Sequence, residues 1–301
     1  MTTTRSGVLL IDKPEGPSSA QVVGRVKRLL GAKKIGHLGT LDPFASGLLL
    51  LGVNEGTKVA DIFLAGTKCY RGVMRLGVQT DSQDATGKVV EERPVPPIGA
   101  AQLRALEQQF TGSLQQVPPM FSALKKDGVR LYRLARQGKE VPREPRSITI
   151  SALTLRRCGA HEIEFDVACS RGTYVRTLAA DMGRHLGCGA HLSSLRRTAC
   201  GALTIEQAVT LEELEKRCEK PSGLMLSLAA ALAHLRAVRW PSRTLARLRL
   251  GQQELLGQIG DAQPGERLIR VLDQRGQLAA LAEWTDQPPR GRWRLLRVFQ
   301  E

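Results

Sequence analysis

The chain has 301 residues, of which 42% are hydrophobic and 24% are charged. This length is typical of two domains, and this composition argues against intrinsic disorder and against a membrane-spanning protein. The formal net charge of +15 favours a polyanionic partner, of which nucleic acid is the commonest soluble kind. A compositional habit of the source genome is the alternative explanation of this charge.

The first quarter of the chain predicts strands and helices around one glycine-punctuated loop. Val22, Val26 and Leu30 recur at helical spacing, and the apolar run LLLLGV is typical of a buried strand. Polar and apolar residues alternate in CYRGVMRLGV, which predicts a further strand. The expected elements are a strand over 8–14, a helix that Ser18 and Ser19 can cap and that runs to about Leu30, the loop over 33–47, a strand over 48–53, a helix over 58–64 and a strand over 69–78.

A basic, proline-rich segment over 118–148 interrupts the middle of the chain. Phe121 and Tyr132 are interleaved with its cations, which indicates a hairpin or insertion presented at the surface. A helix is expected before it, over 100–110. A strictly alternating strand is expected after it, over 161–170; this strand continues through RGTYVR before the chain turns helical.

The residues after about 235 differ in composition, because they contain Arg but no Lys. Short alternating stretches lie near 268–272 and 278–282, and the ending GRWRLLRVFQ alternates as well. We therefore expect two domains, a large one over 1–235 and a small, β-rich one over 236–301.

The loop that carries Asp42 is the most informative segment for chemistry. Gly36 and Gly39 permit tight or left-handed backbone, and Pro43 restricts the residue before it to an extended conformation. A single carboxylate thus lies on a constrained turn, beside His37 and ahead of a buried strand. Catalytic side chains concentrate on such loops, although an Asp-Pro turn also occurs for structural reasons alone.

Aromatic and cationic residues lie together at three places in the chain. The three tyrosines, Tyr70, Tyr132 and Tyr174, each lie within two residues of an arginine. If residues 171–176 form an extended strand, Tyr174 and Arg176 point to the same face. This pattern suits base stacking with phosphate contact, but tyrosines packed at a sheet edge beside solvated arginines would look the same.

Motifs for metals and nucleotide cofactors are absent from the sequence. It contains no GxxxxGK[ST], no GxGxxG after a strand, no HExxH and no GxSxG. Its six cysteines include no CxxC pair, so free, mostly buried thiols are expected rather than a zinc site or disulfides. We therefore predict neither a metal nor a cofactor.

Five ordered blocks resemble the TruB-type tRNA pseudouridine synthases. The block GHLGTLDPFASGLLLLGVNEGTK looks like the catalytic motif of that family. The others are LLIDKPEGPSS, YRGVMRLGVQTDSQDATG, VPPMFSALKKDGVRLYRLARQGKEVPREPRSI and CSRGTYVRTLAADMGRHLGCGAHLSSLRRTACG. The blocks run from about residue 8 to residue 201, which makes the resemblance specific. The residues after them resemble the small PUA-like RNA-binding domain of the family only loosely.

The resemblance implies an α+β fold in which helices flank a mixed, mainly antiparallel sheet, with a PUA-like C-terminal domain. It implies that uridine 55 in the T arm of tRNA is isomerised to pseudouridine by an enzyme that needs no cofactor. From the residues themselves we expect a cytoplasmic protein, since no secretory signal is evident, and a monomer without membrane or protein partners, since no exposed apolar helix face stands out. Carried over by motif, the site residues are Asp42 as the catalyst, with His37, Tyr70, Tyr174, Arg176 and Leu195 around the substrate. The basic insertion offers Lys125, Lys126, Arg130 and Arg133 to the RNA backbone.

Several alternatives remain open at this point. The same scaffold would serve a non-catalytic RNA-binding or tRNA-folding protein, or a guide-RNA-dependent relative in a larger complex. An unrelated glycosidase would need a second carboxylate, and no motif marks one. Within the enzyme hypothesis, Asp42 attacks the sugar, attacks the base or removes a ribose proton.

Overall fold

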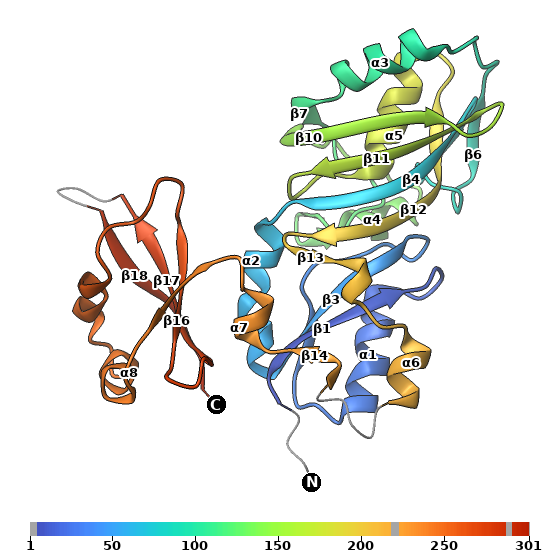
Figure 1. The fold of residues 1–301 in the computed structure, drawn as a ribbon. Helices are drawn as coiled ribbons and strands as arrows, with labels where there is room; N and C mark the ends of the chain where they lie inside the picture. The colour runs from blue at the N-terminus through green and yellow to red at the C-terminus, as the bar shows by residue number, and fades with distance from the viewer. Residues whose placement is uncertain (1–4, 218–222, 287–290, 301) are drawn as a thin grey trace.

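The computed structural model describes residues 5–217, 223–286 and 291–300. Figure 1 shows a large part built on one long, twisted sheet and a smaller β-rich part beside it, which carries the C-terminus. The mixed α/β architecture with a mainly antiparallel sheet confirms the predicted fold class.

The large sheet has ten strands in the order β14-β1-β3-β12-β4-β11-β10-β7, with β2 beside β3 and β13 beside β12. Every pairing in it is antiparallel except the one between β12 and β3. The strand bounds are β1 Gly7–Lys13, β2 Ile35–His37, β3 Ser46–Val53, β4 Lys68–Leu76, β7 Gly112–Gln116, β10 Arg146–Arg157, β11 Glu162–Cys169, β12 Ala190–Cys200, β13 Leu203–Thr204 and β14 Met225–Leu226.

Helices cover both halves of this sheet. Figure 1 shows α1 and α6 beside β1, and α3 and α5 beside β10 and β11. The Ser18 side chain caps α1 in a capping box and Gly31 ends it in the left-handed conformation, so the predicted helix is confirmed. The helix bounds are α1 Ser19–Leu30, η1 Asn54–Val59, α2 Ala60–Ala65, α3 Ala100–Gln109, α5 Val175–His185, η2 Ile205–Gln207, α6 Leu211–Lys216 and α7 Leu228–Ala231.

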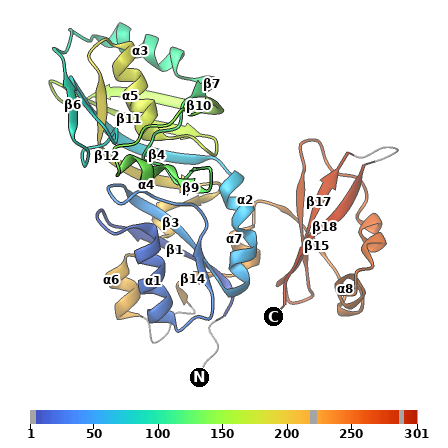
Figure 2. The ribbon, with the colours of Figure 1, turned by 180° about the vertical axis from the view of Figure 1, so that it is seen from behind.

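Two excursions leave the large sheet. The first is a two-stranded ribbon between β4 and α3, made of β5 Val78–Thr80 and β6 Val89–Glu92. The second lies between β7 and β10 and corresponds to the predicted basic insertion; it holds the hairpin of β8 Lys125–Lys126 and β9 Val129–Arg130, followed by α4 Leu131–Ala135. Figure 2 shows β9 and α4 next to the middle strands of the sheet.

The C-terminal part is a four-stranded sheet in the order β15-β16-β17-β18. Its own core is built around Trp240, Leu256 and Trp293. Another core cluster joins it to the large part, since Leu281 and Phe299 pack with residues of β1 and β3. The bounds are β15 Arg236–Arg239, α8 Ser242–Arg249, η4 Gln253–Ile259, β16 Leu268–Leu272, β17 Leu278–Thr285 and β18 Arg292–Val298. The domain division at residue 235 stays a prediction.

Candidate active site

The loop that carries Asp42 runs from the end of β2 to the start of β3 and is fixed from both sides. The Ser19 hydroxyl donates to the Leu41 carbonyl at 2.7 Å and accepts from the Leu41 N–H at 2.8 Å, at a buried position. Gly39 has a φ of +150°, and the Ala45 N–H donates to the Asp42 carbonyl at 3.2 Å. The Asp42 side chain nevertheless stays 41% exposed. A rigid backbone therefore presents a carboxylate that solvent can reach.

Arg176 contacts this carboxylate directly. Its Nε donates to Asp42 Oδ2 at 2.9 Å, while its two Nη atoms donate to the carbonyl oxygens of Ser82 and Phe121, both at 2.8 Å. Its Nη1 also lies 3.7 Å from Asp84 Oδ2. The side chain is only 5% exposed, so its planar fork is held by contacts on every edge. This geometry aims one positive charge at Asp42.

The extended strand expected through residues 171–176 is wrong. Strand β11 ends at Cys169, Gly172 turns the chain with a φ of +81°, and α5 begins at Val175. Tyr174 is thus the N-cap residue of α5, and Arg176 lies in the first helical turn. A turn and a helix start, rather than a strand, therefore bring Arg176 to Asp42.

Tyr174 is held by an amide that sequence analysis did not single out. The Tyr174 N–H donates to Gln116 Oε1 at 2.8 Å, and Gln116 Nε2 donates back to the Tyr174 carbonyl at 3.1 Å. Burial raises the pKa of the Tyr174 phenol, an effect that the Ser122 hydroxyl opposes and the Asp42 charge reinforces.

Tyr70 lies on β4, directly opposite Arg197 of β12 in the antiparallel register. The residue is half-buried. Burial raises the pKa of the Tyr70 phenol, and the Arg197 charge opposes that rise. Tyr70 also packs against the core cluster of the large part.

The other predicted substrate residues lie at different depths. His37 ends β2 and is exposed, and its pKa is lowered by desolvation first and by the Arg197 charge second. Leu195 is 6% exposed and belongs to the same core cluster as Leu41 and Ala45. The predicted role of Leu195 in the pocket stays a prediction.

Lys13 is a second residue that the sequence analysis missed. It is fully buried, and its Nζ donates to the carbonyls of Pro14, Pro17 and Pro43 at 2.7, 3.0 and 3.3 Å. Desolvation lowers the pKa of Lys13 to about 8, while the negative charge of Asp42 acts in the opposite direction. Its contact with Pro43 ties the end of β1 to the residue after Asp42.

The predicted RNA-backbone residues all lie on the second excursion. Lys125 and Lys126 form β8, Arg130 ends β9 and Arg133 lies on α4. Lys125, Arg130 and Arg133 are exposed, and Lys126 donates from Nζ to the Pro142 carbonyl at 3.2 Å. They do not contact Asp42, but Phe121 of the same excursion accepts from Arg176, which links the insertion to the site.

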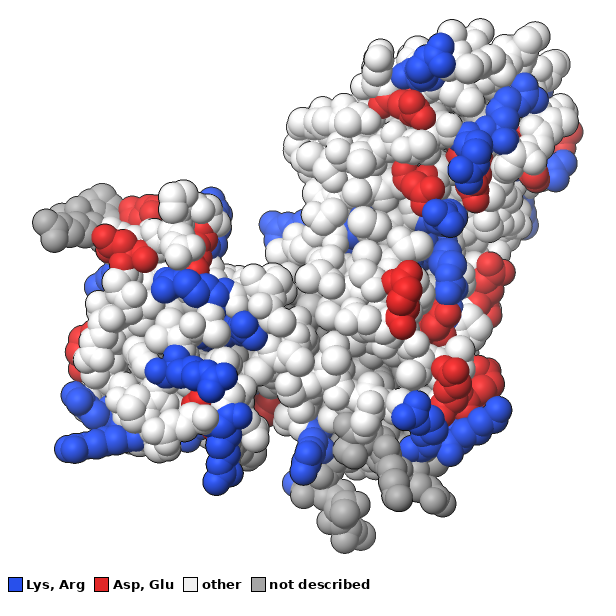
Figure 3. Space-filling model, in the orientation of Figure 1, with Lys and Arg blue, Asp and Glu red and all other residues white. Residues whose placement is uncertain are grey.

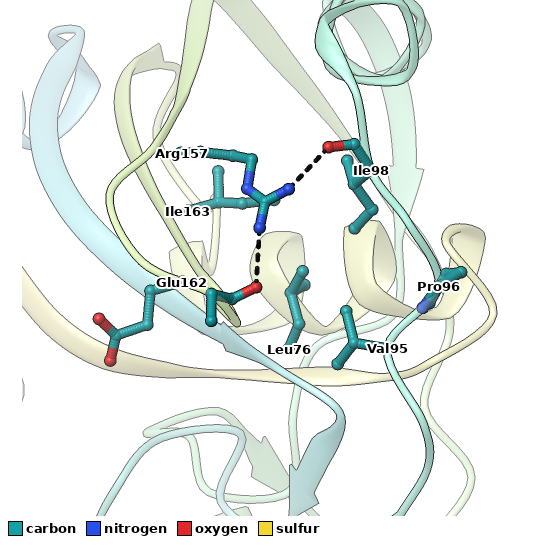
Figure 4. Close-up of a pocket in the computed structure, with 8 residues that line it drawn as sticks. Leu76, Val95, Pro96, Ile98, Arg157, Glu162 and Ile163 are labelled. Carbon is teal, nitrogen blue, oxygen red and sulfur yellow. Dashed lines mark hydrogen bonds between the residues drawn. The ribbon is translucent and has the colours of Figure 1, made fainter.

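A different cavity, drawn in Figure 4, lies away from these residues. It is lined by Leu76, Val95 and Ile98 together with Arg157, whose guanidinium donates to the carbonyls of Ile98 and Ala160, both at 3.0 Å. The guanidinium of Arg157, the charged group in this cavity, is therefore already hydrogen-bonded to the backbone. Among the described residues, no set of three or more His, Cys, Asp or Glu side chains is placed to hold a metal ion. Within the same ranges, no helix is long and apolar enough to cross a bilayer.

Comparison with known proteins decides the family. Residues 27–175 match the model of the TruB family pseudouridylate synthase N-terminal domain, and residues 176–238 match that of the tRNA pseudouridylate synthase B C-terminal domain. The chain belongs to the TruB family of pseudouridylate synthases. The predicted family is confirmed. The range matched by the first family model includes Asp42, Tyr70 and Tyr174, and the range matched by the second begins at Arg176.

Relatives in the TruB family cover most of the chain. It is 50% identical over 270 residues to the tRNA pseudouridine synthase B of Burkholderia lata, covering 89% of this chain and 83% of that protein. It is 42% identical over 302 residues to that of Syntrophotalea carbinolica, covering 98% of each. Among solved structures, a crystal structure of a Cbf5-Nop10-Gar1 complex matches with a TM-score of 0.71 and 25% identity, covering 98% of this chain and 85% of that one.

Proposed function

We propose that this protein isomerises uridine 55 in the T arm of tRNA to pseudouridine, with Asp42 as the catalytic residue. The observation that carries the proposal is the solvent-reachable Asp42 carboxylate, held on a fixed loop and paired at 2.9 Å with the buried Arg176. Membership of the TruB family and relatives named tRNA pseudouridine synthase B support the reaction class.

The reaction breaks the bond between ribose C1′ and uracil N1, turns the base and rejoins it through C5. The C5 proton is lost and N1 gains one, so atoms balance with no outside group and no change of oxidation state. One ionised carboxylate suffices, whether it attacks C1′, attacks the base or removes a ribose proton. Arg176 holds the Asp42 carboxylate in a fixed orientation in each case. Cleavage at C1′ resembles glycoside chemistry, in which a carboxylate faces a developing sugar cation.

The target uridine has to leave its stack before Asp42 reaches it. Extruding a base costs about a few kcal/mol, and stacking on an aromatic ring returns about 1–3 kcal/mol per base. Tyr70 offers the half-exposed ring for this stacking, and Tyr174 closes the space beside Asp42. His37 and Leu195 complete the substrate pocket in this proposal.

In this proposal the insertion and the C-terminal part bind the remainder of the tRNA. The insertion presents Lys125, Arg130 and Arg133 to solvent, and Figure 3 shows further Lys and Arg side chains over the C-terminal part. The C-terminal sheet acts as the PUA-like RNA-binding domain. We further propose that the protein works in the cytoplasm as a monomer without protein partners or cofactors.

The test uses purified protein and an unmodified tRNA transcript, with pseudouridine mapped at single-nucleotide resolution. We expect the wild type to modify position 55 alone and without added RNA or protein, and Asp42→Asn to form no detectable product. Asp61→Asn is the matched control, because that carboxylate is 86% exposed and remote from Arg176. Product absent from the wild type would exclude the enzyme, and normal turnover by Asp42→Asn would exclude the assigned catalyst.

A further inference from the structure

We propose that Gln116 is a positioning residue for the reaction, which fixes the start of α5 and through it holds Arg176 against Asp42. This inference rests on the proposed function and deepens it. Gln116 is only 3% exposed, so it acts through the residues that it holds and does not touch the RNA.

The Gln116 side chain binds both backbone polar groups of one distant residue. Gln116 is the last residue of β7, and its amide accepts from the Tyr174 N–H at 2.8 Å and donates to the Tyr174 carbonyl at 3.1 Å. The two residues are 58 positions apart in the chain. A carboxamide offers an acceptor and donors side by side, so this pair of bonds fixes the orientation of the Tyr174 backbone as well as its distance.

Helix α5 lacks the usual local acceptor for its first N–H. In a capping box, a Glu or Gln at the third helical position accepts from the N–H of the N-cap residue. The N-cap residue of α5 is Tyr174, which makes no side-chain cap bond, and the third helical residue is Thr177, whose hydroxyl donates to Gln83 Oε1 at 2.8 Å. Gln116 therefore supplies, from another strand, the acceptor that the sequence of the helix does not provide.

The first turn of α5 carries the group that contacts Asp42. Arg176 is the second helical residue after Tyr174, and its Nε donates to Asp42 Oδ2 at 2.9 Å. The Leu178 N–H donates at 3.0 Å to the same Tyr174 carbonyl that Gln116 binds, so the amide is joined to the first hydrogen bond within the helix. A shift of the Tyr174 backbone would therefore be passed to Arg176 by one helical turn.

The chain that follows Gln116 enters the basic insertion and contacts the same turn of α5. Phe121, a few residues later, accepts from Arg176 Nη2 at 2.8 Å. One short stretch of chain thus holds two residues of one helical turn. The Phe121 carbonyl contacts only one edge of the guanidinium, so it does not replace the two bonds by which Gln116 fixes the helix start.

Methionine at position 116 would keep the length of the side chain and lose its polar contacts. Met is unbranched like Gln, but its thioether has no donor and is only a weak acceptor. Gln116→Met therefore leaves the buried Tyr174 N–H without its acceptor. Because misplacement of reacting groups by about 1 Å can cost about a hundredfold in rate, the defect should appear in the chemical step rather than in RNA binding.

The test measures single-turnover conversion of tRNA at saturating protein and, separately, tRNA affinity. We expect Gln116→Met to slow conversion about tenfold to hundredfold, with affinity within about twofold of wild type. Gln115→Met is the matched control, because that residue precedes Gln116 on β7 and is exposed. Thr210→Ala is the control for lost stability, because it removes the side-chain cap of α6, where Thr210 Oγ1 accepts from the Glu213 N–H at 3.1 Å.

The outcomes separate the two proposals. An inactive wild type overturns the proposed function and this inference with it. With an active wild type, this inference alone is overturned if Gln116→Met converts tRNA as fast as Gln115→Met, if it is slowed no more than Thr210→Ala, or if its affinity falls as much as its rate.

A second variant decides if Gln116→Met does not fold. Gln116→Glu keeps the shape of the side chain and an acceptor for the Tyr174 N–H, but its ionised carboxylate cannot donate to the Tyr174 carbonyl. Slower conversion at unchanged affinity supports the positioning role, and wild-type conversion refutes it. If Gln116→Glu does not fold either, Gln116 is required for folding, and a role confined to positioning is refuted.

Discussion

Two groups of cations in this molecule have opposite surroundings. Around the Asp42 loop, Lys13, Arg176 and Arg197 are buried and donate to backbone carbonyls. On the insertion, the side chains of Arg130 and Arg133 are exposed to solvent. Each cation of either group counts equally in the net charge of +15.

Net charge alone therefore overstates the charged surface that the protein offers to RNA. A buried guanidinium whose donors all have partners acts as a structural clamp, because removing it leaves carbonyls without donors. An exposed lysine or arginine has little structural value and remains available to phosphate. We therefore expect the buried cations around the Asp42 loop to govern the rate of the reaction. The exposed cations of the insertion should govern tRNA affinity and its dependence on salt.

Arg176→Lys should produce the largest effect. Lysine keeps the charge but cannot satisfy Asp42, Ser82 and Phe121 at once, so the carboxylate loses its fixed orientation. We expect single-turnover conversion to fall about a hundredfold or more, with little change in tRNA affinity. Arg184→Lys on the same helix is the control, because that side chain is 62% exposed and pairs with Asp181. A decrease in tRNA affinity as large as the decrease in rate would contradict the expectation that buried cations govern the rate and exposed cations govern the affinity.

Neutralising the insertion should give the reverse pattern. Replacing four of its cations by Gln should weaken tRNA binding and lower the slope of log affinity against log salt by about 0.7 to 0.9 for each phosphate that is no longer neutralised. Conversion at saturating protein should stay near wild type. The measurement is tRNA affinity across a salt series, and the replaced residues are Lys125, Lys126, Arg130 and Arg133.

The control for this variant removes the same number of charges elsewhere. Equal weakening in both variants would mean that binding follows net charge rather than the insertion. The control residues are exposed ones on and just after α1, namely Lys27, Arg28, Lys33 and Lys34.

Much of the fold follows from local sequence patterns. The helix after Ser18, the buried strand LLLLGV and the alternating strand over 161–170 are present in the structure within a few residues of their predicted ends. Each depends on spacing and capping that a short window contains. The loop of Asp42 could be found for the same reason, since its glycines and Pro43 are adjacent.

The clamps around the site could not be found in this way. Arg197 is 149 residues from its partner Leu48, and Lys13 is 30 residues from Pro43. A strand arginine is normally solvated, so the sequence around Arg197 gives no sign that its side chain is buried. Only the pairing of β12 with β3 and β4 shows that Arg197 points inward and Arg196 does not.

A substitution of Lys13 should give the smallest effect, and that effect should depend on pH, because burial lowers the pKa of Lys13. Its pKa is lowered from 10.5 to about 8 in the folded protein, so the unfolded chain holds more protons between those values. The Lys13 contribution to the free energy of unfolding is therefore greatest above pH 10.5 and falls as the pH drops through 8. Relative to Lys13→Met, wild type should gain about 1–2 kcal/mol between about pH 7.5 and pH 9.5 in urea unfolding. The control Lys88→Met, at an exposed lysine, should show no such change with pH. If the difference in free energy of unfolding between wild type and Lys13→Met stays constant with pH, the ammonium of Lys13 is as well solvated as that of an exposed lysine.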